Sequence, residues 1–377
     1  MGSSCKVVKT KTKLPHLPEL DGLRGLAALA VFFHHFFQDP RDSPLTTWPP
    51  LLKFFLYLSG YGALGVDVFF VLSGYLITSL LLVDRDSPSY FHNFYWKRVL
   101  RIMPVYMVHL LVAALFIQHA TGYILLSLIF VVNFAQLFRV ADIGPAWTLS
   151  IEEQFYLIWP QFIRRLRLPA IYYLAFALAI LSATARIIVP LWHGGLNLRY
   201  TIYRCDGLAL GAILACQWFS SEGQTRLIRI VLGILNSNVA LLLVFFAQTV
   251  MLLHFPRTLF SESVTLTTTN YLVYRIIHRI VFLRNRSGLS WLASPITVYL
   301  GGISYALYMY HTFILYFLGL HFGLVQPDHY LSTFIRATLS LLIVIAVCTI
   351  SRYALELPVQ RLRRFVLQPR KAGAESS

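Results

Sequence analysis

Charged side chains are scarce in this sequence. They make up 13% of its 377 residues, whereas soluble globular domains carry about 25%. Hydrophobic residues make up 57%, and long apolar segments recur to the end of the chain. We therefore expect an all-α, polytopic membrane protein, folded as one transmembrane helix bundle rather than as several soluble domains.

Cysteine is also rare, and the four cysteines are dispersed. Their spacing fits neither a metal site nor a disulfide framework, so we expect packing roles for them and no bound metal. The sequence has no Gly-rich phosphate loop and no Ser-His-Asp signature. We expect no permanently bound cofactor.

Acidic residues are half as numerous as basic ones, 16 against 32, and the formal net charge is +16. Most lysines and arginines lie in short clusters between apolar segments, where the positive-inside rule places them. The excess positive charge therefore indicates a lipid bilayer as partner and no nucleic acid. No apolar run precedes residue 20, so we expect no cleavable signal peptide.

The apolar segments predict the membrane topology. They lie at about 22–38, 61–83, 102–119, 122–138, 147–163, 170–190, 204–219, 228–254, 264–283, 296–320 and 332–355. If all of them crossed, the basic clusters would fall on both sides of the membrane. If 122–138 is re-entrant or tilted instead, the clusters at 97–101, 164–167, 226–229, 284–286 and 361–371 all lie inside.

We therefore expect about ten spans with both termini in the cytosol. A basic cytosolic tail at 1–18 would precede a membrane domain at 19–358, and a basic tail at 359–377 would follow it. The Asn285–Ser287 sequon would then be cytosolic and unglycosylated.

Ionisable residues mark the first apolar segment. Arg24 and His35 are eleven residues apart, which on a helix puts them within roughly 20° on one face and about 16 Å apart. Asp21 lies near that face, whereas His34 points about 80° away from Arg24. Such groups cost about 2.5–3.5 kcal/mol each at the bilayer centre. We therefore expect these groups to be shielded from lipid and to take part in the protein's function.

Two further arginines, Arg98 and Arg101, are spaced i, i+3 and project from one side of a predicted helix. One interpretation is that they anchor the helix at the cytosolic surface under the positive-inside rule. Two guanidinium groups in this arrangement are also suited to binding phosphates. Both interpretations stay open.

Buried carboxylates suggest ion pairs. Asp67 lies early in an apolar run that also contains Ser73, and it predicts either an ion pair with a buried arginine or a site role. Arg204 and Asp206 open a later segment and suggest a local ion pair.

Two more polar groups lie within predicted helices. Glu152 and Glu153 follow Ser150, and adjacent glutamates diverge by ~100° on a helix, so at most one of them shares the inward face with Ser150. Acidic residues at a helix N-terminus are also favoured by the helix dipole alone. Ser304, Tyr308 and His311 form a polar stripe at i, i+4 and i+7.

The sequence resembles the acyltransferase type 3 family of multi-pass membrane O-acyltransferases. The resemblance rests on six ordered stretches: 19–29 with His35, 65–77, 98–104, 147–156, 204–208 and 302–311. The family's pattern of an arginine, ten residues and a histidine maps onto Arg24 and His35, the pair that helical phase selects.

The resemblance implies an enzyme in which His35 is the catalytic base and the region of Ser150 and Glu153 supports the active site. Arg24, Arg98 and Arg101 would help to hold an acyl-CoA donor, usually acetyl-CoA, with Arg24 at the cytosolic entrance. The product would be an acylated hydroxyl group, formed directly or through an acyl-histidine. A carboxylate that orients His35 must come from another span, because Asp21 is too distant on the same helix.

Two questions stay open at this point. The same ionisable residues suit a membrane transporter of an acyl group or small metabolite that forms no bond. The acceptor is also undefined. We expect no esterase-like domain of the kind that some sugar-modifying members carry, and this expectation favours a small-molecule or simple carbohydrate acceptor.

Overall fold

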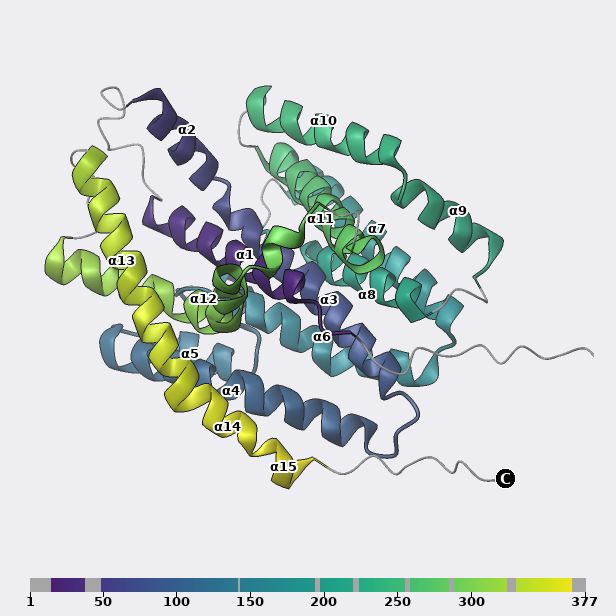
Figure 1. The fold of residues 1–377 in the computed structure, drawn as a ribbon, viewed down its shortest axis with the longest axis horizontal. Helices are drawn as coiled ribbons and strands as arrows, with labels where there is room; N and C mark the ends of the chain where they lie inside the picture. The colour runs from purple at the N-terminus through teal and green to yellow at the C-terminus, as the bar shows by residue number, and fades with distance from the viewer. Residues whose placement is uncertain are drawn as a thin grey trace, which may run out of the picture.

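A computed structural model describes residues 15–37, 49–141, 143–193, 197–219, 224–254, 258–284, 288–323 and 330–367. Every regular element within these ranges is helical, as expected (Figure 1). The Asn285–Ser287 sequon and most of both basic tails lie outside the described residues.

The first half of the bundle runs from α1 to α7. Its elements are α1 (Pro18–Phe36), α2 (Pro50–Ser59), η3 (Gly62–Leu64), α3 (Gly65–Val83), α4 (Tyr90–Phe116), α5 (Thr121–Leu128), η4 (Val132–Phe138), α6 (Ala146–Arg165) and α7 (Leu168–His193).

The second half continues to the C-terminal helices. Its elements are η5 (Thr201–Tyr203), α8 (Cys205–Phe219), α9 (Arg226–Leu235), α10 (Asn238–His254), α11 (Leu259–Phe282), η7 (Ser290–Ala293), α12 (Pro295–Phe322), α13 (Tyr330–Ser351), η8 (Arg352–Glu356), α14 (Leu357–Arg361) and α15 (Arg363–Val366).

Several of these helices are suited to crossing a membrane. Within the described ranges, five segments have the length and apolarity of a span: Lys53–Val83, Tyr90–Phe116, Leu168–Val189, Pro295–Phe322 and Leu331–Val366. The pair α9 and α10, bent by 51°, adds a sixth if it counts as one broken span. The expected number of about ten spans is not confirmed. The segment 122–138 divides into α5 and η4, of 8 and 7 residues, each too short to cross.

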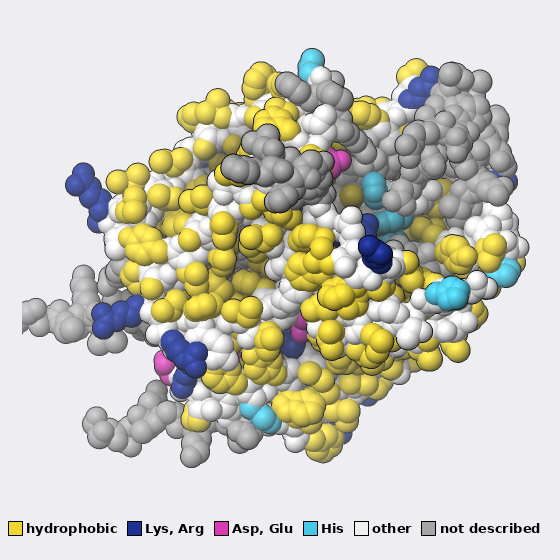
Figure 2. All heavy atoms as spheres, turned by 180° about the vertical axis from the view of Figure 1, so that it is seen from behind, with side chains coloured by type: hydrophobic (Ala, Val, Ile, Leu, Met, Phe, Trp, Pro, Cys, Tyr) yellow, Lys and Arg dark blue, Asp and Glu magenta, His cyan; other side chains and the backbone are white. Residues whose placement is uncertain are grey.

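Large hydrophobic side chains cover much of the outer surface, as the yellow spheres of Figure 2 show. On α10, Leu242 and Phe246 are each 68% exposed, and on α13 Ile350 is 65% exposed. A water-soluble protein would bury such residues, whereas lipid tails solvate them. The protein is a multi-pass membrane protein.

Helix α1 runs through the middle of the molecule and packs against α3 and α12 (Figure 1). Its contact with α12 is exceptionally close. A Cβ on Gly301 would lie 2.0 Å from the carbonyl oxygen of Asp21, and one on Gly25 would lie 2.6 Å from the backbone nitrogen of Gly301. Glycine lets the two backbones touch, and this contact sets the polar face of α1 against the polar stripe of α12.

Candidate active site

A cavity between five helices collects several of the polar residues that the sequence singles out. It spans about 1000 Å³, part of it open to the surroundings. Its polar lining comes from α1 (Arg24), α3 (Ser73), α4 (Arg98, Arg101), α6 (Thr148, Glu152, Tyr156) and α12 (Ser304, Tyr305, Tyr308). We call it the arginine cavity. All three arginines expected to bind the donor line it.

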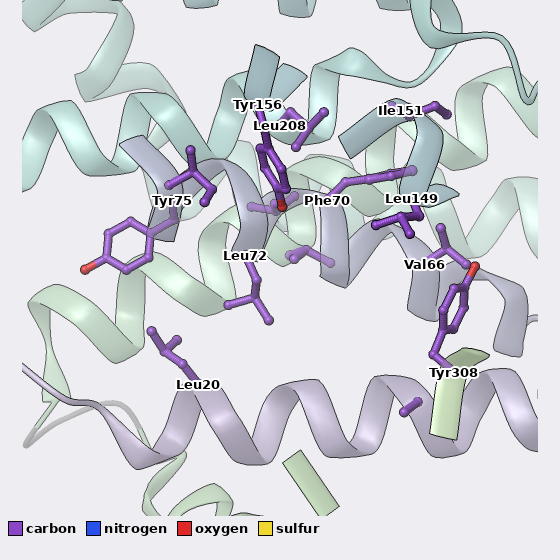
Figure 3. Packing of buried hydrophobic residues seen from close by; sticks show 14 of the residues in the cluster. Leu20, Val66, Phe70, Leu72, Tyr75, Leu149, Ile151, Tyr156, Leu208 and Tyr308 are labelled. Atoms are coloured by element: carbon purple, nitrogen blue, oxygen red, sulfur yellow. The ribbon is translucent and has the colours of Figure 1, made fainter. Parts of the chain in front are cut away.

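Glu152 is the hydrogen-bonding centre of this cavity. Ser73 donates to its Oε1 at 2.6 Å, and the Tyr156 hydroxyl donates to its Oε2 at 3.3 Å. The Arg98 guanidinium lies 5.2 Å from the centre of the Tyr156 ring, within cation–π range. Figure 3 shows Tyr156 and Tyr308 directed from α6 and α12 toward the part of α3 that carries Phe70 and Val66. The network fixes the orientation of the tyrosine that supports Arg98.

The arginine cavity has a positive lining. Three arginines and one glutamate give its described walls a formal charge of +2. Arg24 also contacts Asp21 at 3.4 Å, at the edge of the cavity where that carboxylate is 29% exposed. Guanidinium groups bind phosphate oxygens in pairs. The lining therefore suits a ligand with phosphate groups.

His35 contacts a second histidine. Its Nδ1 lies 2.9 Å from the carbonyl oxygen of Val31 and 3.2 Å from Nε2 of His311. The Nδ1 of His311 lies 2.8 Å from the carbonyl oxygen of Tyr308 and 3.1 Å from that of Leu307. Because carbonyl oxygens only accept, both Nδ1 atoms carry the proton.

The tautomers follow from these bonds. With its proton on Nδ1, neutral His311 accepts at Nε2, and His35 shares its Nδ1 proton between Val31 and His311. The Nε2 of His35 then keeps its lone pair and can act as a base. No carboxylate within the described ranges lies at ion-pair distance from His35. The expected partner from another span is therefore an imidazole on α12.

Four aromatic side chains form a continuous row through this region. The ring centre of Tyr308 is 6.0 Å from that of His311, His311 is 4.9 Å from His35, and His35 is 5.2 Å from His34. We call these residues the ring row. It begins in the arginine cavity, which Tyr308 lines, and it ends in a second cavity, which His34 lines.

The second cavity spans about 920 Å³ and lies beside Trp147, so we call it the Trp147 cavity. No described residue lines both cavities. Its polar and aromatic lining comprises His34, Tyr61, Trp147, Arg199, Arg204, Ser261, Glu262 and Thr265. Sequence reasoning assigned no role to Arg199 or Glu262, which belong to no motif, and only their position beside the ring row draws attention to them.

A thin partition separates the two cavities. The Arg204 guanidinium lies 5.6 Å from the ring centre of Phe70, which lines the arginine cavity, and 5.4 Å from that of Trp147. The two rings are themselves 6.4 Å apart. The Arg204 partition, formed by these three side chains, is therefore about one side chain thick.

The ion pairs differ from the local pair that the sequence suggests. Arg204 binds Asp67 at 3.2 Å, which supports the expectation that Asp67 pairs with a buried arginine. Asp206 does not pair with Arg204. It binds Arg186 of α7 at 2.6 Å, and both side chains are buried. Local pairing of Arg204 with Asp206 was therefore the wrong interpretation, because the start of α8 presents the two side chains to different neighbouring helices.

The structure does not bring two other predicted residues to the arginine cavity. Ser150 is fully buried and donates to the carbonyl oxygen of Ala146 in its own helix, at 3.2 Å. Glu153 does not line the cavity, and Glu152 takes the inward position instead. Glu152 and Tyr156 are four residues apart and share a face, a spacing that sequence reasoning could have used to prefer Glu152.

A comparison with known protein families identifies the family to which this chain belongs. Residues 17–353 match the acyltransferase 3 family model, which is described as an acyltransferase domain. The chain belongs to this acyltransferase family. The match covers nearly all of the described bundle, both cavities and the ring row.

Relatives of this acyltransferase include a putative O-acetyltransferase of Staphylococcus aureus strain COL. It is 26% identical over 344 residues, which cover 81% of this chain and 52% of the relative. The peptidoglycan O-acetyltransferase OatA of Listeria monocytogenes is 30% identical over 174 residues, which cover 41% of this chain and 25% of the relative.

A third relative is the putative peptidoglycan O-acetyltransferase YrhL of Bacillus subtilis, 30% identical over 234 residues that cover 54% of this chain and 33% of the relative. The acyltransferase thus spans about half the length of the first relatives it matches, or less. No solved structure matches it.

Proposed function

We propose that the protein transfers an acetyl group from acetyl-CoA to a sugar hydroxyl, with His35 as the general base. One observation carries this proposal. Arginines of α1 and α4 line a single cavity, and a row of rings leads from that cavity to an imidazole with an available Nε2 lone pair.

Acetyl-CoA is the donor that best suits the arginine cavity. Coenzyme A carries several phosphate groups, and Arg24, Arg98 and Arg101 can neutralise them. Glu152 holds Tyr156 in place beneath Arg98. The apolar part of the lining, such as Phe69 and Met309, suits the thioester arm.

The reaction requires one proton to move twice. The acceptor hydroxyl gives its proton to Nε2 of His35 while its oxygen attacks the thioester carbonyl carbon. The carbon–sulfur bond then breaks, and the leaving thiolate takes the proton from Nε2. General-base help of this kind contributes ~10²–10⁴-fold, so positioning of the two substrates must supply the rest. His311 holds the imidazole in the required tautomer.

A sugar is the acceptor that the relatives favour, since two of them are named for the O-acetylation of peptidoglycan. A sugar hydroxyl has no charge, so it needs a base in the site to become a nucleophile at neutral pH. His35 meets that need.

The test uses the purified full-length protein with acetyl-CoA labelled in the acetyl group and an N-acetylglucosamine tetrasaccharide. We expect label on the sugar that mild alkali releases as acetate, as an ester requires. The transporter alternative predicts label that enters proteoliposomes unchanged and no ester. The second result, with no labelled sugar, would contradict the proposal.

A further inference from the structure

We propose that the Trp147 cavity is the binding site for the acceptor, and that this acceptor is an uncharged carbohydrate. The inference rests on the proposed O-acetyltransferase function and assigns a place to its second substrate. The argument uses the position of the cavity, its charge and the groups on its walls.

Position is the first argument. A transfer reaction between two substrates needs both of them within reach of one base. The ring row joins the two cavities, and His35 lies inside it, one ring from the Trp147 cavity and two rings from the arginine cavity. The Arg204 partition is the other boundary between them. A hydroxyl in the Trp147 cavity therefore approaches the base from the side opposite the donor.

Charge is the second argument. Asp67 neutralises Arg204 at 3.2 Å. Among the described residues of the cavity wall, the remaining ionic groups are Arg199 and Glu262, whose formal charges cancel. By the same count, with Arg24 paired to Asp21, the described walls of the arginine cavity keep a formal charge of +1. The Trp147 cavity is thus poorly suited to phosphate groups and well suited to a neutral polyol.

The wall chemistry is the third argument. The half-buried Glu262 carboxylate can accept hydrogen bonds from neighbouring hydroxyls, and Thr265 one helical turn away can both donate and accept. Apolar side chains such as Leu64 and Met251 complete the lining and can cover the C–H faces of a sugar ring. Small-molecule sites usually have a largely apolar wall that carries a few polar groups.

The cavity draws on parts of the chain outside the predicted motifs. Glu262 and Thr265 lie in the first two turns of α11, and Met251 lies near the end of α10. Arg199 precedes η5, and its guanidinium lies 5.6 Å from the ring centre of Trp147. Both cavities share α1 and α6, but among the described residues α10 and α11 contribute only to the Trp147 cavity, whereas α3, α4 and α12 contribute only to the arginine cavity.

The experiment compares Glu262→Gln and Thr265→Val with wild type in the full-length protein. Binding of the N-acetylglucosamine tetrasaccharide is measured by calorimetry, and its KM is measured with labelled acetyl-CoA. Asp86→Asn, which changes an exposed carboxylate on the loop after α3, is the matched control. Hydrolysis of acetyl-CoA by water without the sugar reports the donor half of the reaction alone.

We expect Glu262→Gln to raise the Kd and the KM for the tetrasaccharide about tenfold, and Thr265→Val about threefold. Acetyl-CoA hydrolysis should stay within about twofold of wild type, as for Asp86→Asn. If both variants bind the tetrasaccharide with a Kd within about twofold of wild type, the Trp147 cavity is not the acceptor site. A wild-type protein that hydrolyses acetyl-CoA but does not bind the tetrasaccharide would overturn the carbohydrate assignment.

The proposed function can fail separately. If wild type neither hydrolyses acetyl-CoA nor acetylates any acceptor, the O-acetyltransferase function is wrong. Calorimetry still decides the site in that case, because loss of tetrasaccharide binding in Glu262→Gln, with normal binding in Asp86→Asn, supports the cavity without any turnover.

Discussion

The imidazoles of His35 and His311 lie 3.2 Å apart, Nδ1 to Nε2, although 276 residues separate them in the sequence. Both Nδ1 atoms face backbone carbonyl oxygens of their own helices. The pair therefore has one consistent arrangement of protons, and it leaves Nε2 of His35 as the available base.

Replacing His311 tests the role of this contact. His311→Phe keeps a ring of similar shape but removes the acceptor, so we expect kcat to fall about tenfold or more while the Kd for acetyl-CoA stays unchanged. His311→Gln retains an acceptor oxygen and should recover most of the rate. The measurement is steady-state acetyl transfer with calorimetric binding of acetyl-CoA. Equal losses in the two variants would show that His311 acts only through packing.

Replacing Arg98 tests the donor site. Lysine keeps the charge but loses the planar fork and the stacking on Tyr156, so we expect Arg98→Lys to raise the Kd for acetyl-CoA about tenfold and Arg98→Gln to raise it further. Arg229→Gln removes an exposed arginine of α9 and serves as control. If Arg98→Lys binds acetyl-CoA as wild type does, Arg98 is an anchor at the membrane surface rather than a ligand.

Replacing Asp67 tests the buried ion pair behind the Arg204 partition. Asp67→Asn leaves the Arg204 guanidinium buried without its counter-ion, and breaking such a pair costs about 3–5 kcal/mol. Asp84→Asn breaks the half-exposed contact with Lys97 and should cost about 1 kcal/mol or less. Unfolding in detergent, followed by tryptophan fluorescence, measures both. A smaller loss for Asp67→Asn than for Asp84→Asn would be incompatible with the pair.

Two glycines test the packing of α1 against α12. A Cβ at Gly301 would lie 2.0 Å from a backbone oxygen of Asp21, so we expect Gly301→Ala to separate the helices and to reduce both stability and activity. Gly233 in α9 has no neighbouring atom within 4 Å of such a Cβ. Gly233→Ala should stabilise the protein by up to about 1 kcal/mol through helix propensity. We expect the melting temperature to fall in Gly301→Ala and to rise in Gly233→Ala.

The sequence predicts the features that depend on local spacing. The all-helical fold follows from the apolar segments, and the resemblance to the acyltransferase family is confirmed by the match over residues 17–353. Helical phase selects His35 over His34, and the structure places His35, and not His34, against His311. Periodicity is a property of one helix, so it can be read without knowing the neighbours.

The spacing of residues along one helix does not show which residues of other helices they contact. The partner of His35 lies on α12, and the partner of Arg204 lies on α3, 137 residues earlier in the chain. Sequence reasoning instead suggested a carboxylate for the first and Asp206 for the second. The Trp147 cavity could be predicted even less from sequence. Its walls include residues of α1, α6, α10, α11 and the loop before η5, and only the packing of the bundle brings these segments together.

The rate of acetyl transfer by His35→Ala tests the central claim most directly. With saturating labelled acetyl-CoA and the tetrasaccharide, we predict a loss of ~10²–10⁴-fold in kcat and an unchanged Kd for acetyl-CoA. His92→Ala, which removes an exposed imidazole on α4, should transfer acetyl at the wild-type rate. Normal turnover by His35→Ala would contradict the assignment of His35 as the base.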